Sequence, residues 1–110
     1  TTEIYTLSLH DALPIYAHVG PMARIGAGCI INTGAIVEHE SEVGDYAHVS
    51  VSSVIAGRSR LGMLSMLGAG ATIIDGIDVG NNIVVGAGAV VHRSIAASGT
   101  YVGIPAVKLR

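Results

Sequence analysis

One short segment of the chain combines residue types suited to proton transfer. His39 lies between two carboxylates, Glu38 and Glu40. An imidazole is the side chain that most readily exchanges protons near neutral pH, and neighbouring carboxylates would favour its protonated form and increase its basicity. The segment therefore predicts a general base that takes a proton from an attacking amine or hydroxyl, although a surface histidine in an acidic stretch has the same composition.

The elements that position this histidine follow from a six-residue repeat, or hexad. Every sixth residue from Val19 to Val91 is Val, Ile or Leu, without a break. Glycine often comes directly after this residue, and a small residue usually comes four positions after it. A fixed period sustained over this length indicates a solenoid of stacked repeats.

Each hexad suits a short strand followed by a tight corner, and three hexads close one triangular coil. The aliphatic residue points inward and the small residue fills the narrow interior beside it. The glycine suits either unusual backbone angles or a close approach of the next coil. The thirteen aliphatic positions predict about four coils. The fold class is therefore all-β: a parallel β-helix solenoid of hexapeptide repeats with an extra C-terminal segment.

Composition is consistent with one narrow domain. The 110 residues are 50% hydrophobic but only 4% aromatic, which suits an interior with room for Val, Ile and Ala. The net charge of −2 does not indicate a nucleic-acid surface, and no apolar run is long enough to span a membrane. Cys29 is the one cysteine and occupies an inward small position, which gives no disulfide framework and fits a reducing cytoplasm.

Both ends of the chain depart from the repeat. Residues 1–16 carry no hexad and resemble translated sequencing-adapter read-through; a natural cap over the first coil is the alternative. Residues 17–110 are expected to form the β-helix domain. The apolar segment from Tyr101 to Arg110 predicts an extra strand laid over the last coil.

The repeats from Ala17 to Arg110 resemble those of the hexapeptide-repeat acyltransferases, whose fold is a left-handed parallel β-helix. A more specific likeness lies in Asn-Thr-Gly-Ala-Ile-Val-Glu-His-Glu at residues 32–40, in His-Val-Ser at residues 48–50, and in the terminal Val-Gly-Ile-Pro-Ala. These motifs are similar to those of bacterial sugar acetyltransferases, a group with UDP-4-amino-sugar N-acetyltransferases and sialic acid O-acetyltransferases. The resemblance implies an upstream sugar-nucleotide-binding domain, which we expect to be missing from this sequence.

By this resemblance, His39 would be the catalytic base, and Glu40 would orient it and increase its basicity. Residues that are three hexads apart stack on one another, so Gly57 is expected directly over His39. The amide of Gly57 would lie near the reacting carbonyl and could donate to a tetrahedral oxyanion, although an ordinary corner glycine fits the same position. Hexad spacing places no nucleophile beside His39, so we expect direct attack by the acceptor without an acyl-enzyme.

The same resemblance implies acetyl-CoA as the co-substrate. His48 would contact it, and Ala69 and Ala87 would contact it through their backbone, although related sequences often have Gly in place of Ala87. These two alanines stack along the prism axis, which suits an extended pantetheine arm; small residues there could equally serve tight coiling. Asn32 would bind near the acceptor or the thioester, or it would occupy a corner that needs a positive φ.

Stacking places Ala69 and Ala87 on a different side of the triangle from His39. One prism cannot easily bring these groups together but two adjacent protomers can, which predicts a cyclic homotrimer with a site in each cleft. The sequence thus predicts a cytoplasmic enzyme that moves an acetyl group from acetyl-CoA to the amine of a nucleotide-linked amino sugar. O-acetylation of sialic acid or a related sugar is one alternative, and a non-catalytic β-helix scaffold is another.

A metal enzyme is a further alternative on this fold. A γ-class carbonic anhydrase needs three histidines around zinc, two of them closely spaced. The spacing of the five histidines does not reproduce that pattern: His10, His18, His39, His48 and His92. We therefore expect no metal.

Overall fold

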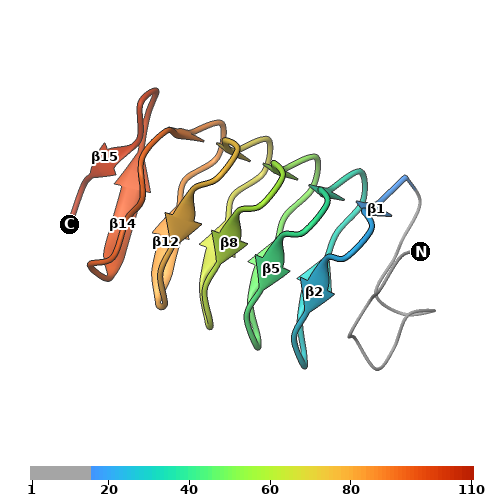
Figure 1. Cartoon of the computed structure of the whole chain (residues 1–110). Coiled ribbons are helices and arrows are strands. Elements are labelled where there is room, and N and C mark those ends of the chain that lie inside the picture. Colours follow the sequence, from blue (N-terminus) through green and yellow to red (C-terminus); the bar gives the residue numbers. More distant parts are fainter. Residues whose placement is uncertain (1–15) are drawn as a thin grey trace.

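The computed structural model of the protein describes residues 16–110, which form a solenoid of short strands joined by tight turns. The chain coils from β1 (His18–Val19) to the pair β14 (Gly99–Val102) and β15 (Val107–Lys108) at the C-terminal end (Figure 1). Within this range no helix is long and apolar enough to cross a membrane. The predicted leader, except for Tyr16, lies outside the described residues.

Each face of the solenoid is one sheet, and consecutive strands visit the three faces in turn. Sheet A contains β1 (His18–Val19), β4 (Ile36–Val37), β7 (Val54–Ile55), β10 (Thr72–Ile73) and β13 (Val90–Val91). Sheet B contains β2 (Arg24–Ile25), β5 (Glu42–Val43), β8 (Arg60–Leu61) and β11 (Asp78–Val79). Sheet C contains β3 (Ile30–Ile31), β6 (His48–Val49), β9 (Met66–Leu67), β12 (Ile83–Val85), β14 (Gly99–Val102) and β15 (Val107–Lys108).

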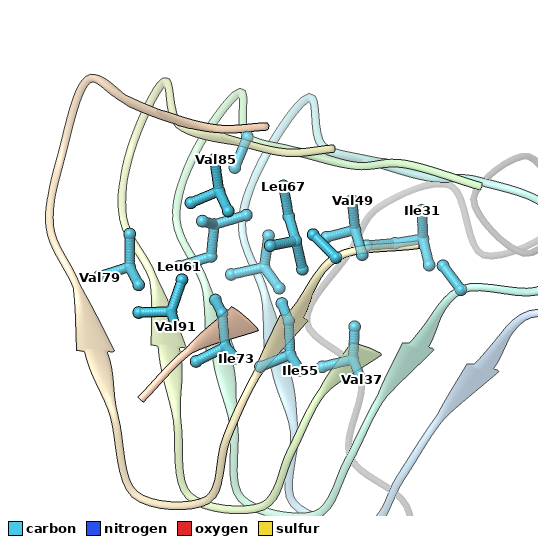
Figure 2. Packing of buried hydrophobic residues seen from close by; sticks show 14 of the residues in the cluster. Ile31, Val37, Val49, Ile55, Leu61, Leu67, Ile73, Val79, Val85 and Val91 are labelled. Carbon is cyan, nitrogen blue, oxygen red and sulfur yellow. The ribbon is translucent and has the colours of Figure 1, made fainter. Parts of the chain in front are cut away.

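The register between neighbouring strands follows the predicted coil of three hexads. Val37 of β4 pairs in parallel with Ile55 of β7, so the inward residue of one coil lies over that of the coil before it. The aliphatic series is buried throughout, and its side chains meet in the middle of the prism (Figure 2). The predicted all-β fold, a parallel β-helix of hexapeptide repeats, is confirmed.

Buried serines take several of the small positions beside this aliphatic column. The hydroxyls of Ser41, Ser59 and Ser65 donate to backbone carbonyls 2.7 to 2.8 Å away on the neighbouring coil. A buried hydroxyl is tolerated when it is hydrogen-bonded in this way. Cys29 has the equivalent position but is only half-buried, and this burial raises the pKa of its thiol.

The glycines after the aliphatic residues allow close approach rather than unusual backbone angles. A Cβ on Gly20 would lie 2.9 Å from the backbone N of His39, on the next coil. Positive φ occurs two positions later in each hexad, in residues of very different types: Met22, Gly28, Gly34, Glu40, Tyr46, Ser52, Arg58, Leu64, Gly70, Gly76, Asn82 and Gly88. Of the two roles considered for these glycines, close packing of coils is therefore the correct one.

The prediction of about four coils is too low, because the solenoid has about five. The hexads end at Val91, but Ile95 forms a parallel bridge with Val79, and β14 pairs in parallel with β12 so that Tyr101 lies beside Val85. The partners in both pairs lie closer in sequence than three full hexads, so the last coil is built without the repeat spacing. The antiparallel strand β15 then supplies the predicted extra segment.

Candidate active site

The turns of the solenoid form three corners that run along its axis. Corner AB connects sheet A to sheet B and contains the turn of His39. Corner CA connects sheet C to sheet A and contains the turns of Asn32, Ala69 and Ala87. Corner BC connects the remaining two sheets. The predicted site residues are thus divided between two corners and, for His48, the outward side of sheet C.

On corner AB, the imidazole of His39 is held by its neighbour in sequence. Its Nδ1 lies 3.1 Å from Oε1 of Glu40. Because an ionised carboxylate only accepts hydrogen bonds, this contact favours the tautomer of the neutral imidazole that carries its proton on Nδ1 and has its lone pair on Nε2. The side chain of His39 is 42% exposed, so a substrate can reach it. The pair therefore presents an oriented base at the surface.

Gly57 lies over His39, as the stacking predicts. The amide of Arg58 donates to the carbonyl of His39 at 2.9 Å, which aligns the two coils at this corner. A Cβ on Gly57 would be 2.5 Å from Nε2 of His39 and 2.9 Å from Oδ1 of Asp75. Gly57 is not among the described residues with positive φ, so the imidazole, and not the backbone angle, requires glycine here.

Two further charged residues complete corner AB, and neither was predicted from the sequence. Nη1 of Arg58 lies 3.8 Å from Oε1 of Glu40, and Nη2 of Arg58 donates to Oδ2 of Asp75 at 3.2 Å. The signal that could have revealed the first contact is spacing, because Glu40 and Arg58 are opposite charges one coil apart. By contrast, Glu38 contacts His18 at 3.9 Å, so its expected effect on His39 is not supported by a contact.

Corner CA is almost free of side chains on two successive coils. Both turns read Gly-Ala-Gly, at residues 68–70 and 86–88, and the two alanines are exposed. The amide of Gly88 donates to the carbonyl of Ala69 at 2.9 Å, so these turns are stacked as predicted. A Cβ on Gly70 or Gly88 would meet no atom within 4 Å. The corner is an open ridge of backbone.

The backbone amides of corners CA and BC differ in their partners. On corner BC, the Asp45 carboxylate accepts from the amide of Ala27 at 2.9 Å, and the Asn81 side chain accepts from that of Met63 at 2.8 Å. Within residues 16–110, the amide of Ala69 donates no hydrogen bond, and neither does that of Ala87. Corner CA therefore fits an extended ligand that carries carbonyl groups, as a pantetheine arm does.

His48 and Asn32 lie close to corner CA rather than beside His39. His48 is half-buried on the outward side of β6, between Ile30 and Met66 of the adjacent strands, and its Nε2 is buried without a hydrogen-bond partner. Oδ1 of Asn32 accepts from the amide of Thr33 at 2.7 Å. The positive φ of that turn belongs to Gly34, so the alternative explanation for Asn32 is wrong.

Sheet A separates the two corners within one chain. The structure brings together His39, Glu40 and Gly57 at one edge of this sheet, and Asn32 and the two exposed alanines lie at the other edge. Among the residues that the structure describes, no group of three or more His, Cys, Asp or Glu side chains could hold a metal ion.

Comparison with known proteins places these features in context. Residues 61–93 match the family described as the hexapeptide repeat of succinyl-transferase. The solved acetyltransferase domain of PglB from Neisseria gonorrhoeae has a TM-score of 0.84 at 33% identity, over 86% of this chain and 46% of that chain. PerB from Caulobacter crescentus, solved with CoA and GDP-perosamine, has a TM-score of 0.74 at 29% identity, over 96% and 57% of the two chains.

Serine acetyltransferases are similar in sequence as well. The enzyme from Synechococcus elongatus is 32% identical over 79% of this chain and 40% of its own length. The chain therefore spans less than half of this curated relative. Together, the matches confirm the predicted resemblance to the hexapeptide-repeat acyltransferases and, among them, to sugar acetyltransferases.

Proposed function

We propose that this chain of acyltransferase-type hexapeptide repeats transfers an acetyl group from acetyl-CoA to the amine of a nucleotide-linked amino sugar. The observation that carries the proposal is the contact of His39 Nδ1 with Glu40, which leaves Nε2 as an exposed base beside the bare backbone of Gly57. Two similar proteins, the PglB domain and serine acetyltransferase, are acetyltransferases. PerB, also similar, was solved with CoA and an amino-sugar nucleotide. These similarities support the proposed reaction class.

In this proposal His39 is the general base of a direct transfer. The nitrogen of the acceptor amine attacks the thioester carbonyl carbon, and Nε2 takes the proton that this nitrogen loses. The carboxylate of Glu40 stabilises the imidazolium that forms. Formation of the C–N bond gives a tetrahedral oxyanion. When this intermediate collapses, the carbonyl re-forms and the C–S bond breaks, and the sulfur of CoA leaves as a thiolate that can accept the proton. The amide of Gly57 is the candidate donor to the oxyanion.

Acetyl-CoA is assigned to corner CA and the adjoining part of sheet C. The amides of Ala69 and Ala87 are spaced by one coil and could donate to successive carbonyls of the pantetheine arm. His48 lies on the sheet that leads into this corner and has a ring nitrogen without a partner in the chain. The PglB domain was solved in complex with acetyl coenzyme A, and it covers 88% of this chain at 30% identity.

A homotrimer would place corner AB of one protomer beside corner CA of the next. The two corners are the two edges of sheet A, whose outward side chains on three strands are apolar and half-buried: Ile36, Val54 and Val90. Sheet B presents alternating charges outward, Arg24, Glu42, Arg60 and Asp78. Sheet C presents exposed apolar side chains, Ile30, Met66 and Val84. A trimer with sheet A toward its threefold axis would bring the two corners together, at less desolvation cost than burying the charges of sheet B. Light scattering should give three times the mass of the chain, and an active monomer would contradict the shared site.

O-acetylation is the second candidate function. It is favoured by the sequence similarity to serine acetyltransferases, and the same base could take a proton from a hydroxyl. In this case the acceptor would be serine, or sialic acid or a related sugar as the sequence motifs imply. If neither class of acceptor reacts, the chain would be interpreted as a non-catalytic scaffold.

Release of free CoA thiol distinguishes these functions. The purified chain and its His39→Gln variant would be given acetyl-CoA with a UDP-linked 4-amino sugar, GDP-perosamine, sialic acid or L-serine. We expect His39-dependent thiol release with an amino-sugar nucleotide. Fastest release with L-serine or sialic acid would replace N-acetylation by O-acetylation. Calorimetric binding of acetyl-CoA without release for any acceptor would favour the scaffold.

A further inference from the structure

We propose that Arg58 is a positioning residue that holds the carboxylate of Glu40 against the imidazole of His39. The inference rests on the proposed function, because it assigns a purpose to the His39–Glu40 contact. Arg58 touches neither the imidazole nor, in the proposed mechanism, the reacting atoms, so it would act through Glu40.

One oxygen atom of Glu40 lies close to both neighbours. Oε1 of Glu40 is 3.1 Å from Nδ1 of His39 and 3.8 Å from Nη1 of Arg58. Because the guanidinium attracts the carboxylate from a fixed side, it stabilises the rotamer in which Oε1 faces His39.

Arg58 is itself held by a second carboxylate. Its Nη2 donates to Oδ2 of Asp75 at 3.2 Å. The side chains of His39 and Asp75 both border the position where Gly57 has no Cβ, and both would contact that atom. The guanidinium is therefore fixed between two carboxylates, which lowers its own freedom to leave Glu40.

The side chain of Glu40 has room to adopt other rotamers. Its side chain is 54% exposed, and it lies at the border of two shallow depressions. One depression is also lined by Met22 and Arg24, and the other by Arg58 and Arg60. Without Arg58, rotation of the carboxylate toward the first depression would meet little resistance. The imidazole would then lose the acceptor that fixes its tautomer.

The test compares Arg58→Gln with Arg60→Gln. Arg60 is the matched control, since its Nη1 lies 3.1 Å from Asp78 in a similar surface pair, while its other hydrogen bond is with Asn81. One readout is the ¹⁵N NMR spectrum of the His39 ring, which reports the tautomer without any acceptor. The second is kcat and KM for acetyl-CoA with whichever acceptor proves active.

We expect Arg58→Gln to shift the Nδ1 signal of His39 and to lower kcat roughly tenfold, within the range of coupled neighbours, at unchanged KM for acetyl-CoA. Arg58→Lys should restore part of the loss, and Arg60→Gln should change neither readout. In a Glu40→Gln background, adding Arg58→Gln should have no further effect on kcat. That non-additivity is what separates action through Glu40 from a general structural role.

An unchanged Nδ1 signal in Arg58→Gln, or kcat losses that multiply in the double variant, would overturn the proposal. Thermal unfolding of each variant checks the fold. If Arg58→Gln does not fold, Asp75→Asn removes the anchor and is judged by the same two readouts. If the unmodified chain acetylates no acceptor, the proposed function fails, whereas the NMR comparison still decides whether Arg58 positions the pair.

Discussion

Corners AB and CA share one backbone geometry but present opposite surfaces. In both, a tight turn follows a buried aliphatic residue, and the third residue after it has a positive φ. Corner AB uses these turns to display His39, Glu40 and Arg58, whereas corner CA displays only glycine and alanine on two successive coils. The repeat constrains the interior but not the corner residues, so one fold can present charged side chains at one edge and open backbone at another.

Corner BC shows that free amides are not a general property of this backbone. There the side chains of Asp45 and Asn81 accept from the amides of Ala27 and Met63 on the preceding coil. A ligand at corner BC would have to displace these contacts. Within residues 16–110 the amides of Ala69 and Ala87 have no such partner, and this difference between corners can be tested by substitution.

The largest effect is expected from removing the base on corner AB. His39→Ala should lower the rate of acetyl transfer by about 10² to 10⁴, the contribution typical of a general base, while the Kd for acetyl-CoA stays unchanged. Rates would be measured by thiol release and affinity by calorimetry. His18→Ala is the matched control, because His18 is another exposed imidazole near a carboxylate, 3.9 Å from Glu38. Retained turnover, or lost binding, would reject the separation of base and cofactor between corners.

Filling the space over the imidazole should be nearly as damaging. In Gly57→Ala, the new Cβ would lie 2.5 Å from Nε2 of His39, so the ring must move. A displacement of about 1 Å can cost roughly 10² in rate, and we expect a loss of this order in kcat. The fold should survive, because the colliding atoms belong to side-chain ends and the φ of Gly57 is not positive.

The control for this variant is the same substitution without the imidazole. Gly57→Ala added to His39→Ala should produce no further loss of the residual rate, since the clash with the ring is gone. A further loss in that background would mean that Gly57 acts independently of His39, for example through its amide.

The periodic part of the molecule was predictable because one physical constraint repeats along it. A narrow prism admits only aliphatic and small side chains at fixed intervals, so burial from Val19 to Val91 could be predicted from the sequence. Stacking of Gly57 over His39 followed from the same period. The fifth coil was missed because its paired positions lie closer in sequence than three hexads. The hexad pattern does not predict such a shortened coil.

The polar contacts of corner AB were less predictable, because long side chains reach beyond their own column. Asp75 stacks above Gly57, yet its carboxylate pairs with Arg58 in the adjacent column. Similarly, both carboxylates next to His39 were expected to act on it, but Glu38 contacts His18 on the preceding coil. The six-residue period determines where each Cα lies. These contacts depend instead on side-chain rotamers, and each rotamer depends on the charged groups around it.

Adding a side chain to the open backbone of corner CA tests its proposed role in cofactor binding. Ala87→Leu adds an exposed side chain at corner CA and should weaken acetyl-CoA binding about tenfold, as expected for a steric clash of about 1 to 3 kcal/mol. The melting temperature should not change, because Ala87 is exposed. Ala27→Leu, also exposed, places the same side chain on corner BC and should leave the Kd unaltered. Equal effects at both corners would reject corner CA as the cofactor site.

The smallest effect is expected at His48, which lies beside corner CA on sheet C. Loss of one hydrogen bond is worth about 0.5 to 1.5 kcal/mol, so His48→Ala should weaken acetyl-CoA binding only a few-fold in a calorimetric titration. Its Nε2 has no partner in the chain, so the substitution leaves no other group unpaired and should change stability little.

Met66→Ala is the control, because it shortens the neighbouring side chain on the same face and separates packing from hydrogen bonding. If Met66→Ala weakens binding as much as His48→Ala, the ligand is held by the apolar surface of sheet C; if only His48→Ala does, the ring nitrogen contacts the cofactor. An unchanged Kd in His48→Ala would confine cofactor binding to the backbone of corner CA.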